Sequence, residues 1–468
     1  MARKLKGLNN KRLKFCLWVD TFGNSVPQII PLDLTDNQFE IYNKISRNYS
    51  NSFLFESLTG PEILAETSVM GFDPKIIIKG YSNKVEVIKK DQDTEIIQTD
   101  DPYAELKKLL KKSKNREYRY LGGAVGIVNY DAIRLVEEIP NMHNASEPLM
   151  EFGIYDDGIL YDNIHKKLFY FYYDENKFGE FKISEGNFES FSASEIIPNM
   201  DKKEFSRIVD KAKQYIYEGD IFQVVLSRKF AFDVDGDSLT LYKTLRNLNP
   251  SPYMYHLKQN DKTLIGASPE MLVRITDDKV ETFPIAGTRK ITDDENENKK
   301  LEKELLHDEK EIAEHTMLVD LGRNDIGKVC KYGTVRPESL MKIKRFSHVQ
   351  HIVTHVVGNL ASEKDMFDAF QAVFPAGTVS GAPKVRAMEI IDALEIEERG
   401  PYAGAVGYFS YNGCCDFAIA IRSIFIEGNK GFVQSGAGIV SDSIAENEFK
   451  ETEHKAKAML QALKEASN

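Results

Sequence analysis

Two pairs of glutamates have the spacing at which carboxylates could share a metal ion. Glu311 and Glu314 lie three residues apart in a segment with helical periodicity, and Glu448 and Glu451 repeat that spacing near the C-terminus. Residues three apart project from one face of a helix. Charged helix faces are usually solvated, but the first pair leads into the apolar stretch 317–321, which is unusual for a surface helix. Four facing carboxylates would repel one another without a hard cation, and Mg²⁺ suits carboxylate and water oxygens.

The segment 284–289, Pro-Ile-Ala-Gly-Thr-Arg, has residues that could bind an anion. After a β-rich stretch, Gly287 and Thr288 offer backbone N–H groups and a hydroxyl, and the small Ala286 leaves room for a ligand against the backbone. Stretches rich in Pro and Gly are more often plain turns. Both interpretations stay open on these residues alone.

Three further features have a functional and a structural interpretation. Arg422 ends the apolar run 417–422, which we expect to be a strand, and an arginine there needs an anionic ligand or an internal ion pair. The Gly-Ala-Gly segment 436–438 allows close approach of a ligand to the backbone. His351 is either a hydrogen-bonded core histidine or a proton-transfer group.

The elements that must position these residues are strands in runs, mixed with helices. Asp201 followed by Glu204, and Ser443 followed by Glu446, predict capping boxes at two helix starts. The expected helices are 102–112, 201–219, 238–248, 296–321, 365–374, 384–394 and a closing helix after 443. The expected strands are 15–20, 53–55, 75–79, 84–88, 122–131, 150–173, 221–232, 253–274, 348–357, 403–411, 416–426 and 431–439, with a polar linker at 179–200. Because strict βαβ alternation is missing, we expect an α+β fold with large, mostly antiparallel sheets.

The composition excludes several classes of partner. The chain has 468 residues and a net charge of −11, whereas binding to nucleic acid or an anionic membrane needs a basic face. No apolar run reaches the roughly 18 residues of a membrane span, and the apolar run at 15–19 ends too early for a signal peptide. Four cysteines without metal-type spacing indicate a reducing compartment, and we expect the cytoplasm.

Six segments together resemble the chorismate-utilising enzyme family, most closely its anthranilate synthase branch. They follow in the family's order over nearly all of 200–455. They are 219–228 (GDIFQVVLSR), 266–270 (GASPE), 284–289 (PIAGTR), 313–325 (from AEH to DLGRND), 374–384 (FPAGTVSGAPK) and 434–440 (QSGAGIV). The resemblance implies antiparallel sheets packed as a sandwich with helices outside. It also implies an N-terminal region, 1–190, with a tryptophan-binding site, and a chorismate-binding catalytic region, 195–468.

The resemblance also implies roles for individual residues. Glu314 and Glu451 match direct ligands of Mg²⁺, with Glu311 and Glu448 acting through water, and the metal would hold the ring carboxylate of chorismate. Glu311 is also a candidate acid for the departing 4-hydroxyl, because a carboxyl among carboxylates can keep a proton. The other matches are substrate contacts at Gly287 and Thr288, groups around the enolpyruvyl carboxylate at Tyr402, Arg422, Gly436, Ala437 and Gly438 with Lys455 nearby, His351 for pyruvate elimination, and Thr378 in the pocket lining.

Two positions choose among the family's reactions. Relatives that add water carry a lysine base where this chain has Gln223, and an amide cannot take a proton from water. Aminodeoxychorismate synthases typically carry a lysine nucleophile where this chain has Ala286, and a methyl group cannot attack the ring. The remaining reaction is attack of ammonia at C2, followed by loss of the C4 hydroxyl and of pyruvate to give anthranilate, the first step of tryptophan biosynthesis. The large component of aminodeoxychorismate synthase remains the alternative.

The first half resembles the family more weakly. Ser57, Pro252, Tyr253 and Met254 match residues that line a tryptophan feedback site, although a structural strand and turn would explain them too. The chain contains no Cys/His/Glu set typical of an amidotransferase, so we expect ammonia from a separate glutamine amidotransferase subunit. A catalytically inactive protein that binds tryptophan or anchors an amidotransferase is an alternative of another class, against which the full set of site residues argues.

Overall fold

The computed structural model describes residues 25–59, 66–143, 148–345 and 349–468. The strand expected at 15–20, with Cys16, lies outside the described residues, as does His348 at the start of another expected strand.

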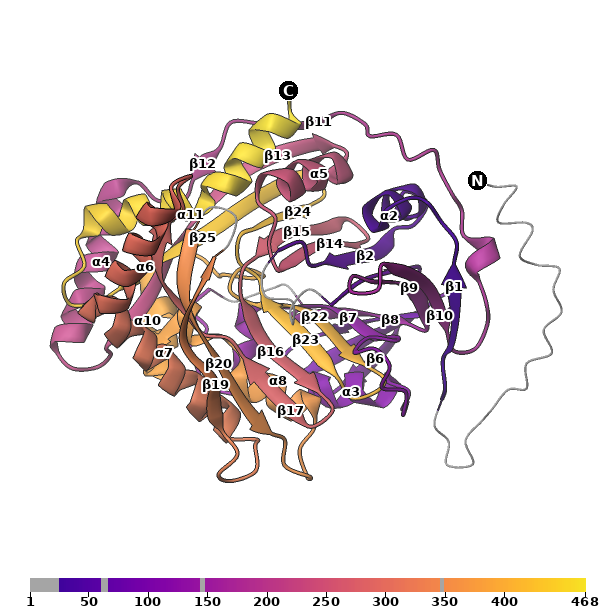
Figure 1. Cartoon of the computed structure of the whole chain (residues 1–468), viewed down its shortest axis with the longest axis horizontal. Helices are drawn as coiled ribbons and strands as arrows, with labels where there is room; N and C mark the ends of the chain where they lie inside the picture. Colours follow the sequence, from indigo (N-terminus) through magenta and orange to yellow (C-terminus); the bar gives the residue numbers. More distant parts are fainter. Residues whose placement is uncertain (1–24, 60–65, 144–147, 346–348) are drawn as a thin grey trace.

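Two large sheets form the framework (Figure 1). The first sheet runs in the order β1 (Gln28–Leu32), β10 (Lys167–Tyr172), β9 (Asp157–Asp162), β3 (Thr67–Phe72), β2 (Asn51–Glu56), β14 (Tyr253–Gln259), β15 (Lys262–Ser268), β24 (Ser423–Glu427), β25 (Lys430–Ile439), β13 (Gln223–Gly236) and β11 (Phe191–Ala193), with β12 (Ile197–Pro198) and β21 (Gly381–Ala382) beside β13. The second runs in the order β18 (Ile285–Lys290), β20 (Val349–Asn359), β17 (Lys279–Thr282), β16 (Met271–Thr276), β23 (Cys415–Ile419), β22 (Ala405–Ser410), β7 (Gly123–Val128), β8 (Met150–Tyr155), β4 (Ile76–Gly80), β5 (Lys84–Lys89) and β6 (Glu95–Gln98), with β19 (Arg336–Arg345) beside β20. The pairings are antiparallel, as the runs of strands in the sequence predicted.

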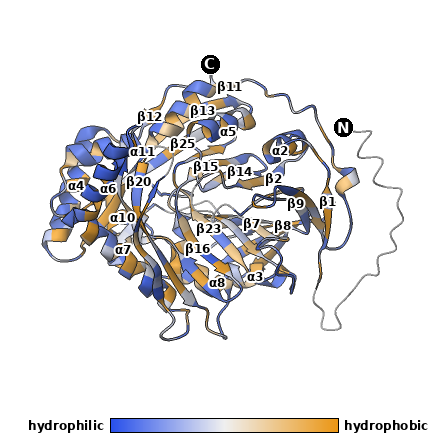
Figure 2. Cartoon of the chain, in the orientation of Figure 1, coloured by the Kyte–Doolittle hydropathy of each residue, from blue (hydrophilic) through white to orange (hydrophobic). Residues whose placement is uncertain are grey.

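The sheets face each other across an apolar core, and helices cover their outer faces. Phe53 and Leu257 of the first sheet pack in one cluster with Val125 and Phe417 of the second. The helices are α2 (Gln38–Ser46), α3 (Pro102–Leu109), α4 (Lys202–Tyr217), α5 (Ser238–Leu248), α6 (Glu295–His307), α7 (Glu309–Gly327), α8 (Met366–Val373), α9 (Gly377–Ser380), α10 (Lys384–Leu394) and α11 (Ala445–Ala466), with short 3-10 helices η3 (Tyr130–Leu135) and η4 (Phe178–Glu180). A second cluster joins α2, α5 and α11 to the first sheet. Peripheral helices such as α4 and α6 carry long hydrophilic stretches (Figure 2). The predicted α+β sandwich is confirmed.

Strands from the two halves of the chain form adjacent blocks within each sheet. β2 pairs with β14 in the first sheet, and β7 pairs with β22 in the second. The division into 1–190 and 195–468 stays a prediction, and both regions contribute strands to one continuous core.

Three expected elements differ from the structure. The helix expected at 296–321 is two helices, because Asp308 caps α7 by accepting hydrogen bonds from the N–H groups of Lys310 and Glu311. The strand expected at 416–426 is β23 in one sheet and β24 in the other, and Arg422 lies between them with φ of 53°. The capping box expected at Ser443 is wrong: Ile444 is the N-cap of α11, and its side chain makes no capping hydrogen bond. The box formed by Asp201 and Glu204 is confirmed.

No helix in the described part of the chain is both long and apolar enough to cross a membrane.

Candidate functional site

The two glutamate pairs come together where α7 and α11 approach β13 and β25. Gln223 at the start of β13 donates a hydrogen bond from Nε2 to Glu314 Oε1 at 3.2 Å. Burial raises the pKa of Glu314, the neighbouring carboxylates of Glu311 and Glu451 raise it further, and Lys455 opposes the shift. Acidic groups from two helices far apart in the sequence therefore lie within electrostatic reach of one another.

Cationic side chains contact two of these carboxylates. Lys455 Nζ lies 2.7 Å from Glu451 Oε1 and donates a hydrogen bond to the Gly436 carbonyl at 3.0 Å. Arg289 Nη1 lies 3.0 Å from Glu311 Oε1. Burial raises the pKa of Glu448, and Glu451 raises it further.

The donor chemistry of this cluster fits a hard divalent cation, although the carboxylates are not gathered around one point. The four side chains offer carboxylate oxygens, the ligands that Mg²⁺ prefers. Burial is the main cause of the raised pKa of Glu314, and a nearby cation would favour its ionised form. Within the described ranges, no three His, Cys, Asp or Glu side chains lie close enough together to hold a metal ion. A cation would have to displace the ion pairs of Glu451 and Glu311 with Lys455 and Arg289.

Arg422 is suited to bind an anion. It lies at the crossover between the sheets, and within the described part of the chain its guanidinium has neither a hydrogen bond nor an ion pair. An internal ion pair, the structural alternative for this arginine, is therefore not found among these residues. Burial lowers its pKa, while Tyr402 and Glu451 oppose the shift, so both lie within electrostatic reach. A poorly compensated buried guanidinium gains from a carboxylate ligand.

Small residues on β25 make room between Tyr402 and Gln223. A Cβ at Gly436 would come within 2.8 Å of the Tyr402 hydroxyl oxygen, and a Cβ at Gly438 within 2.7 Å of Gln223 Nε2. Ala437 between them is fully buried. Glycines at these two positions thus keep the backbone accessible between Tyr402 and Gln223, as expected for the 436–438 segment.

His351 lies opposite the segment of β18 that could bind an anion. Its Nδ1 is 2.8 Å from the Gly287 carbonyl oxygen and 3.1 Å from Thr288 Oγ1. Gly287 has φ of 64° and forms an irregularity in the pairing of β18 with β20, so the segment is a bulged strand and no plain turn. Because a carbonyl only accepts, Nδ1 carries the hydrogen of the neutral ring and Nε2 carries the lone pair. Burial lowers the pKa of His351, which favours this neutral form.

Glu270 is a functional candidate that residue patterns missed. It is 8% exposed, burial raises its pKa to about 8, and Thr378 Oγ1 donates a hydrogen bond to its Oε1 at 2.9 Å. Lys455 opposes the shift. A carboxyl with this pKa holds a proton at neutral pH and can act as a general acid. The ion pair of Glu311 with Arg289 makes Glu311 the weaker candidate for that role.

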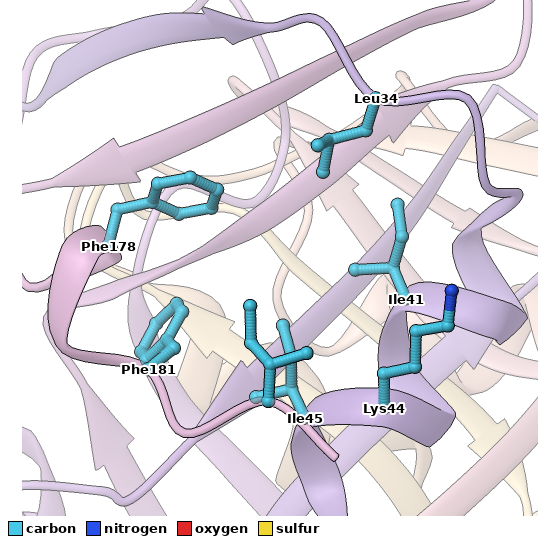
Figure 3. A pocket seen from close by; sticks show the side chains of 7 residues that line it. Leu34, Ile41, Lys44, Ile45, Phe178 and Phe181 are labelled. Atoms are coloured by element: carbon cyan, nitrogen blue, oxygen red, sulfur yellow. The ribbon is translucent and has the colours of Figure 1, made fainter. Parts of the chain in front are cut away.

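One pocket borders these residues, and another lies elsewhere. Glu270 and Thr378 line a pocket with Pro284, Leu318 and Leu321. A separate apolar pocket between α2 and the segment after η4 is shown in Figure 3. It is lined by Leu34, Ile41, Lys44, Ile45, Phe178, Phe181 and Ile183, none of them a predicted site residue. The predicted site residues therefore lie around α7, α9 and β25 and not at this apolar pocket.

Comparison with known proteins decides the family. The family model of the chorismate binding enzymes matches residues 50–461. The chain belongs to this family. It is 45% identical to anthranilate synthase component 1 of Methanothermobacter thermautotrophicus, over 92% of this chain and 93% of the relative, and 42% identical to the component 1 protein of Saccharolobus solfataricus, over 93% and 99%.

Solved structures agree with this assignment. The crystal structure of anthranilate synthase component I from Streptococcus pneumoniae is 37% identical, with a TM-score of 0.75 over 84% of this chain and 92% of that one. The menaquinone-specific isochorismate synthase of Escherichia coli, 18% identical with a TM-score of 0.72 over 94% and 95%, shares the fold.

In this chorismate-binding enzyme, the two specificity positions lie beside the acidic cluster and the histidine. Gln223 Oε1 is buried without a hydrogen-bond partner among the described residues, while its Nε2 binds Glu314. Ala286 pairs with Ile352, next to His351. Neither position offers an amine to the pocket.

The residues predicted to bind tryptophan lie together at the end of β2. The N–H of Leu58 donates to the Ser251 carbonyl at 3.2 Å, and Met254 pairs with Glu56, so Ser57 lies beside the turn that contains Pro252. The Ser57 hydroxyl is buried and has no partner in the described ranges. Tyr253 differs, because its hydroxyl donates to Asp416 of the second sheet at 3.0 Å.

Proposed function

We propose that this chain is the large component of an anthranilate synthase, which converts chorismate and ammonia to anthranilate and pyruvate. The observation that carries the proposal is the Gln223–Glu314 hydrogen bond. The family resemblance implies a water-activating lysine at position 223 in relatives that add water, and in this chain an amide bound to a predicted metal ligand stands there. The relatives named anthranilate synthase component 1 support it.

Binding uses the cationic and backbone groups on one side of the pocket. Arg422 and the Tyr402 hydroxyl, with the open backbone at Gly436 and Gly438, bind the enolpyruvyl carboxylate. Glu314 and Glu451 would hold Mg²⁺ directly, with Glu311 and Glu448 through water. When bound, the ion supplies positive charge to the ring carboxylate.

Amination needs an acid on the leaving hydroxyl. Ammonia attacks C2 and forms the C–N bond, both ring double bonds shift, to C1=C6 and C4=C5, and the C4–O bond breaks. Glu270 gives its proton to that oxygen, which leaves as water, and a proton lost from the new ammonium group balances the step. No covalent bond to the protein is needed.

Pyruvate loss needs a base. His351 Nε2 takes the proton from C2, the C3–O bond breaks, and the ring becomes aromatic as the enolpyruvyl group leaves and tautomerises to pyruvate. The hydrogen bond from Nδ1 to the Gly287 carbonyl fixes the tautomer that this role requires.

The aminodeoxychorismate synthase large component is the second candidate, and the methyl group of Ala286 argues against it because no nucleophile is available there.

We further propose that a separate glutamine amidotransferase supplies ammonia, that tryptophan inhibits at Ser57, and that the enzyme acts in the cytoplasm. The name "component 1" of its relatives supports a partner chain.

The test is product identification. Purified chain is incubated with chorismate, ammonium and MgCl₂, and products are separated by liquid chromatography with fluorescence and mass detection. We expect anthranilate and pyruvate in equal amounts. Isochorismate or 4-amino-4-deoxychorismate as the main product, or no turnover, would contradict the proposal.

A further inference from the structure

The segments 320–325 and 374–384, which both carry family motifs, are joined by a buried ion pair. Lys384 Nζ lies 2.6 Å from Asp325 Oδ2 and donates a second hydrogen bond to the Val373 carbonyl at 2.9 Å. The two charged side chains are 11% and 6% exposed. Removing one partner of such a pair leaves an uncompensated buried charge. The pair is therefore a strong constraint on whatever it connects.

What it connects is the base of the loop that carries Thr378. The loop leaves α8 at Val373 and enters α10 at Lys384, so one ammonium group binds both of its ends. Between them, α9 presents the Thr378 hydroxyl to Glu270 Oε1. Closing the base limits the conformations of the loop, and with them the positions open to Thr378.

The loop that carries Thr378 packs against helix α7. Leu321 and Asp325 are four residues apart and share one face of the helix. A Cβ at Gly377 would overlap the Leu321 side chain, so the loop backbone lies directly on the helix, and Asp325 binds Lys384 one turn further on. The same helix carries Glu314 in its first half. Helix α7 thus positions both the predicted metal ligand Glu314 and the residues against which the Thr378 loop packs.

We propose that the Lys384–Asp325 pair is a positioning element for proton donation by Glu270. It holds the Thr378 hydroxyl on Oε1, which keeps the carboxylic proton on Oε2 for the departing C4 oxygen. Lys384 touches no reacting atom and acts through Thr378. This inference rests on the proposed function, because it assigns a role within the amination step.

A double-mutant cycle on the full-length chain tests it. Lys384→Met and Thr378→Val are measured singly and together, with kcat and KM for chorismate at saturating ammonium. Each single variant should lower kcat by about 10- to 100-fold, the cost of a misplaced catalytic group, with KM nearly unchanged. If Lys384 acts through Thr378, the double variant should be no slower than the slower single variant, to within about twofold. Multiplying effects would overturn the proposal.

A matched control separates positioning from general stability. Arg134 also binds a buried aspartate on a helix, Asp392 of α10, but lies outside the site. Arg134→Met should destabilise the fold, leave kcat of the folded enzyme nearly unchanged, and combine with Thr378→Val as independent changes. Lys384→Arg, which keeps the charge, should recover most of kcat, and failure to do so would count against the proposal.

Folding and identity are controlled separately. Melting curves establish that each variant is folded at the assay temperature, and Asp325→Asn replaces Lys384→Met in the cycle if the latter is not. Anthranilate formation by the unmodified chain is measured first. Absent turnover there refutes the proposed function, whereas an active enzyme with multiplying effects refutes this inference alone.

Discussion

Two carboxylates, the buried Glu56 and the half-buried Glu314, show how differently a fold can surround the same side chain. Glu56 on β2 accepts hydrogen bonds from the Tyr242 hydroxyl at 2.7 Å and from Arg246 Nε and Nη2 at 2.9 and 3.0 Å. Among the described residues, Glu314 on α7 accepts one hydrogen bond, from the Gln223 amide, and lies near the carboxylates of Glu311 and Glu451. The first is satisfied by the fold itself. Glu314 has too few protein partners for its charge, so a ligand must compensate it. This difference in hydrogen bonding distinguishes a carboxylate of the candidate site from one that only stabilises the fold.

The largest expected effect is at the unsatisfied carboxylate. Glu314→Ala should lower kcat/KM by about a thousandfold or more, since a metal that neutralises reacting charge is worth several kcal/mol. The melting temperature should stay the same or rise, because a poorly compensated charge is removed. Steady-state kinetics over a range of MgCl₂ and a melting curve check this. Unchanged activity of Glu314→Ala at limiting Mg²⁺ would contradict a functional role for Glu314 and remove its contrast with Glu56.

Glu270→Gln extends the comparison to a neutral carboxyl. We expect kcat to fall by about 10²- to 10⁴-fold, the usual value of a general acid. In the unmodified enzyme, Glu270 is protonated below its pKa of about 8 and ionised above it, so kcat should fall as pH rises through that value. The variant should lose this alkaline limb. A limb that persists in Glu270→Gln would assign the acid to another group.

His351→Met should affect the second step more than the first. Without a base at C2, amination continues while pyruvate loss slows, by about 10²-fold or more. Rapid quenching with mass detection should then reveal an aminated intermediate that still carries the enolpyruvyl group. Equal slowing of both steps, with no intermediate, would contradict this role.

The satisfied carboxylate should respond in the opposite way. Glu56→Ala leaves Arg246 without its partner, and breaking a buried pair costs about 3–5 kcal/mol in the free energy of unfolding. For the folded fraction, kcat should change little. Urea unfolding combined with kinetics on the same sample checks both. A stable but inactive Glu56→Ala would erase the difference between scaffold and site.

The smallest expected effect is the stabilisation by tryptophan of the region next to Glu56. If Ser57 lines a tryptophan pocket, saturating tryptophan should raise the melting temperature by about 2 °C or more, because a ligand that binds only the folded state stabilises it. Ser57→Ala should reduce that shift while Ser192→Ala, on the distant strand β11, should not. A flat response at millimolar tryptophan would remove the feedback hypothesis.

Local signals in the sequence were enough for much of the fold. The helix at Ser238–Leu248 has the bounds that its periodicity predicted, and Asp201 with Glu204 forms the expected capping box. The break at Asp308 was missed because helical periodicity continues on both sides of the cap. The run 416–426 predicts a single strand because its apolar residues continue through the crossover. Only the pairing of β23 and β24 with different sheets reveals the break.

The site was predictable where spacing defines a helix face and not where burial defines a protonation state. Glu311 and Glu314 could be paired from their spacing. The raised pKa of Glu270 arises from burial, and nothing in the Pro269-Glu270 sequence measures that. The ion pairs of Arg289 with Glu311 and of Lys455 with Glu451 likewise depend on contacts, the first of them between segments separated along the chain.

The place of Arg422 at the crossover between β23 and β24 has a mechanical consequence. Its backbone is tethered to one layer on its N-terminal side and to the opposite layer on its C-terminal side. Any displacement of one sheet relative to the other must therefore change the backbone conformation at Arg422. A carboxylate bound to its guanidinium would restrict the relative motion of the two sheets. Substrate binding should therefore slow amide hydrogen exchange even far from the pocket.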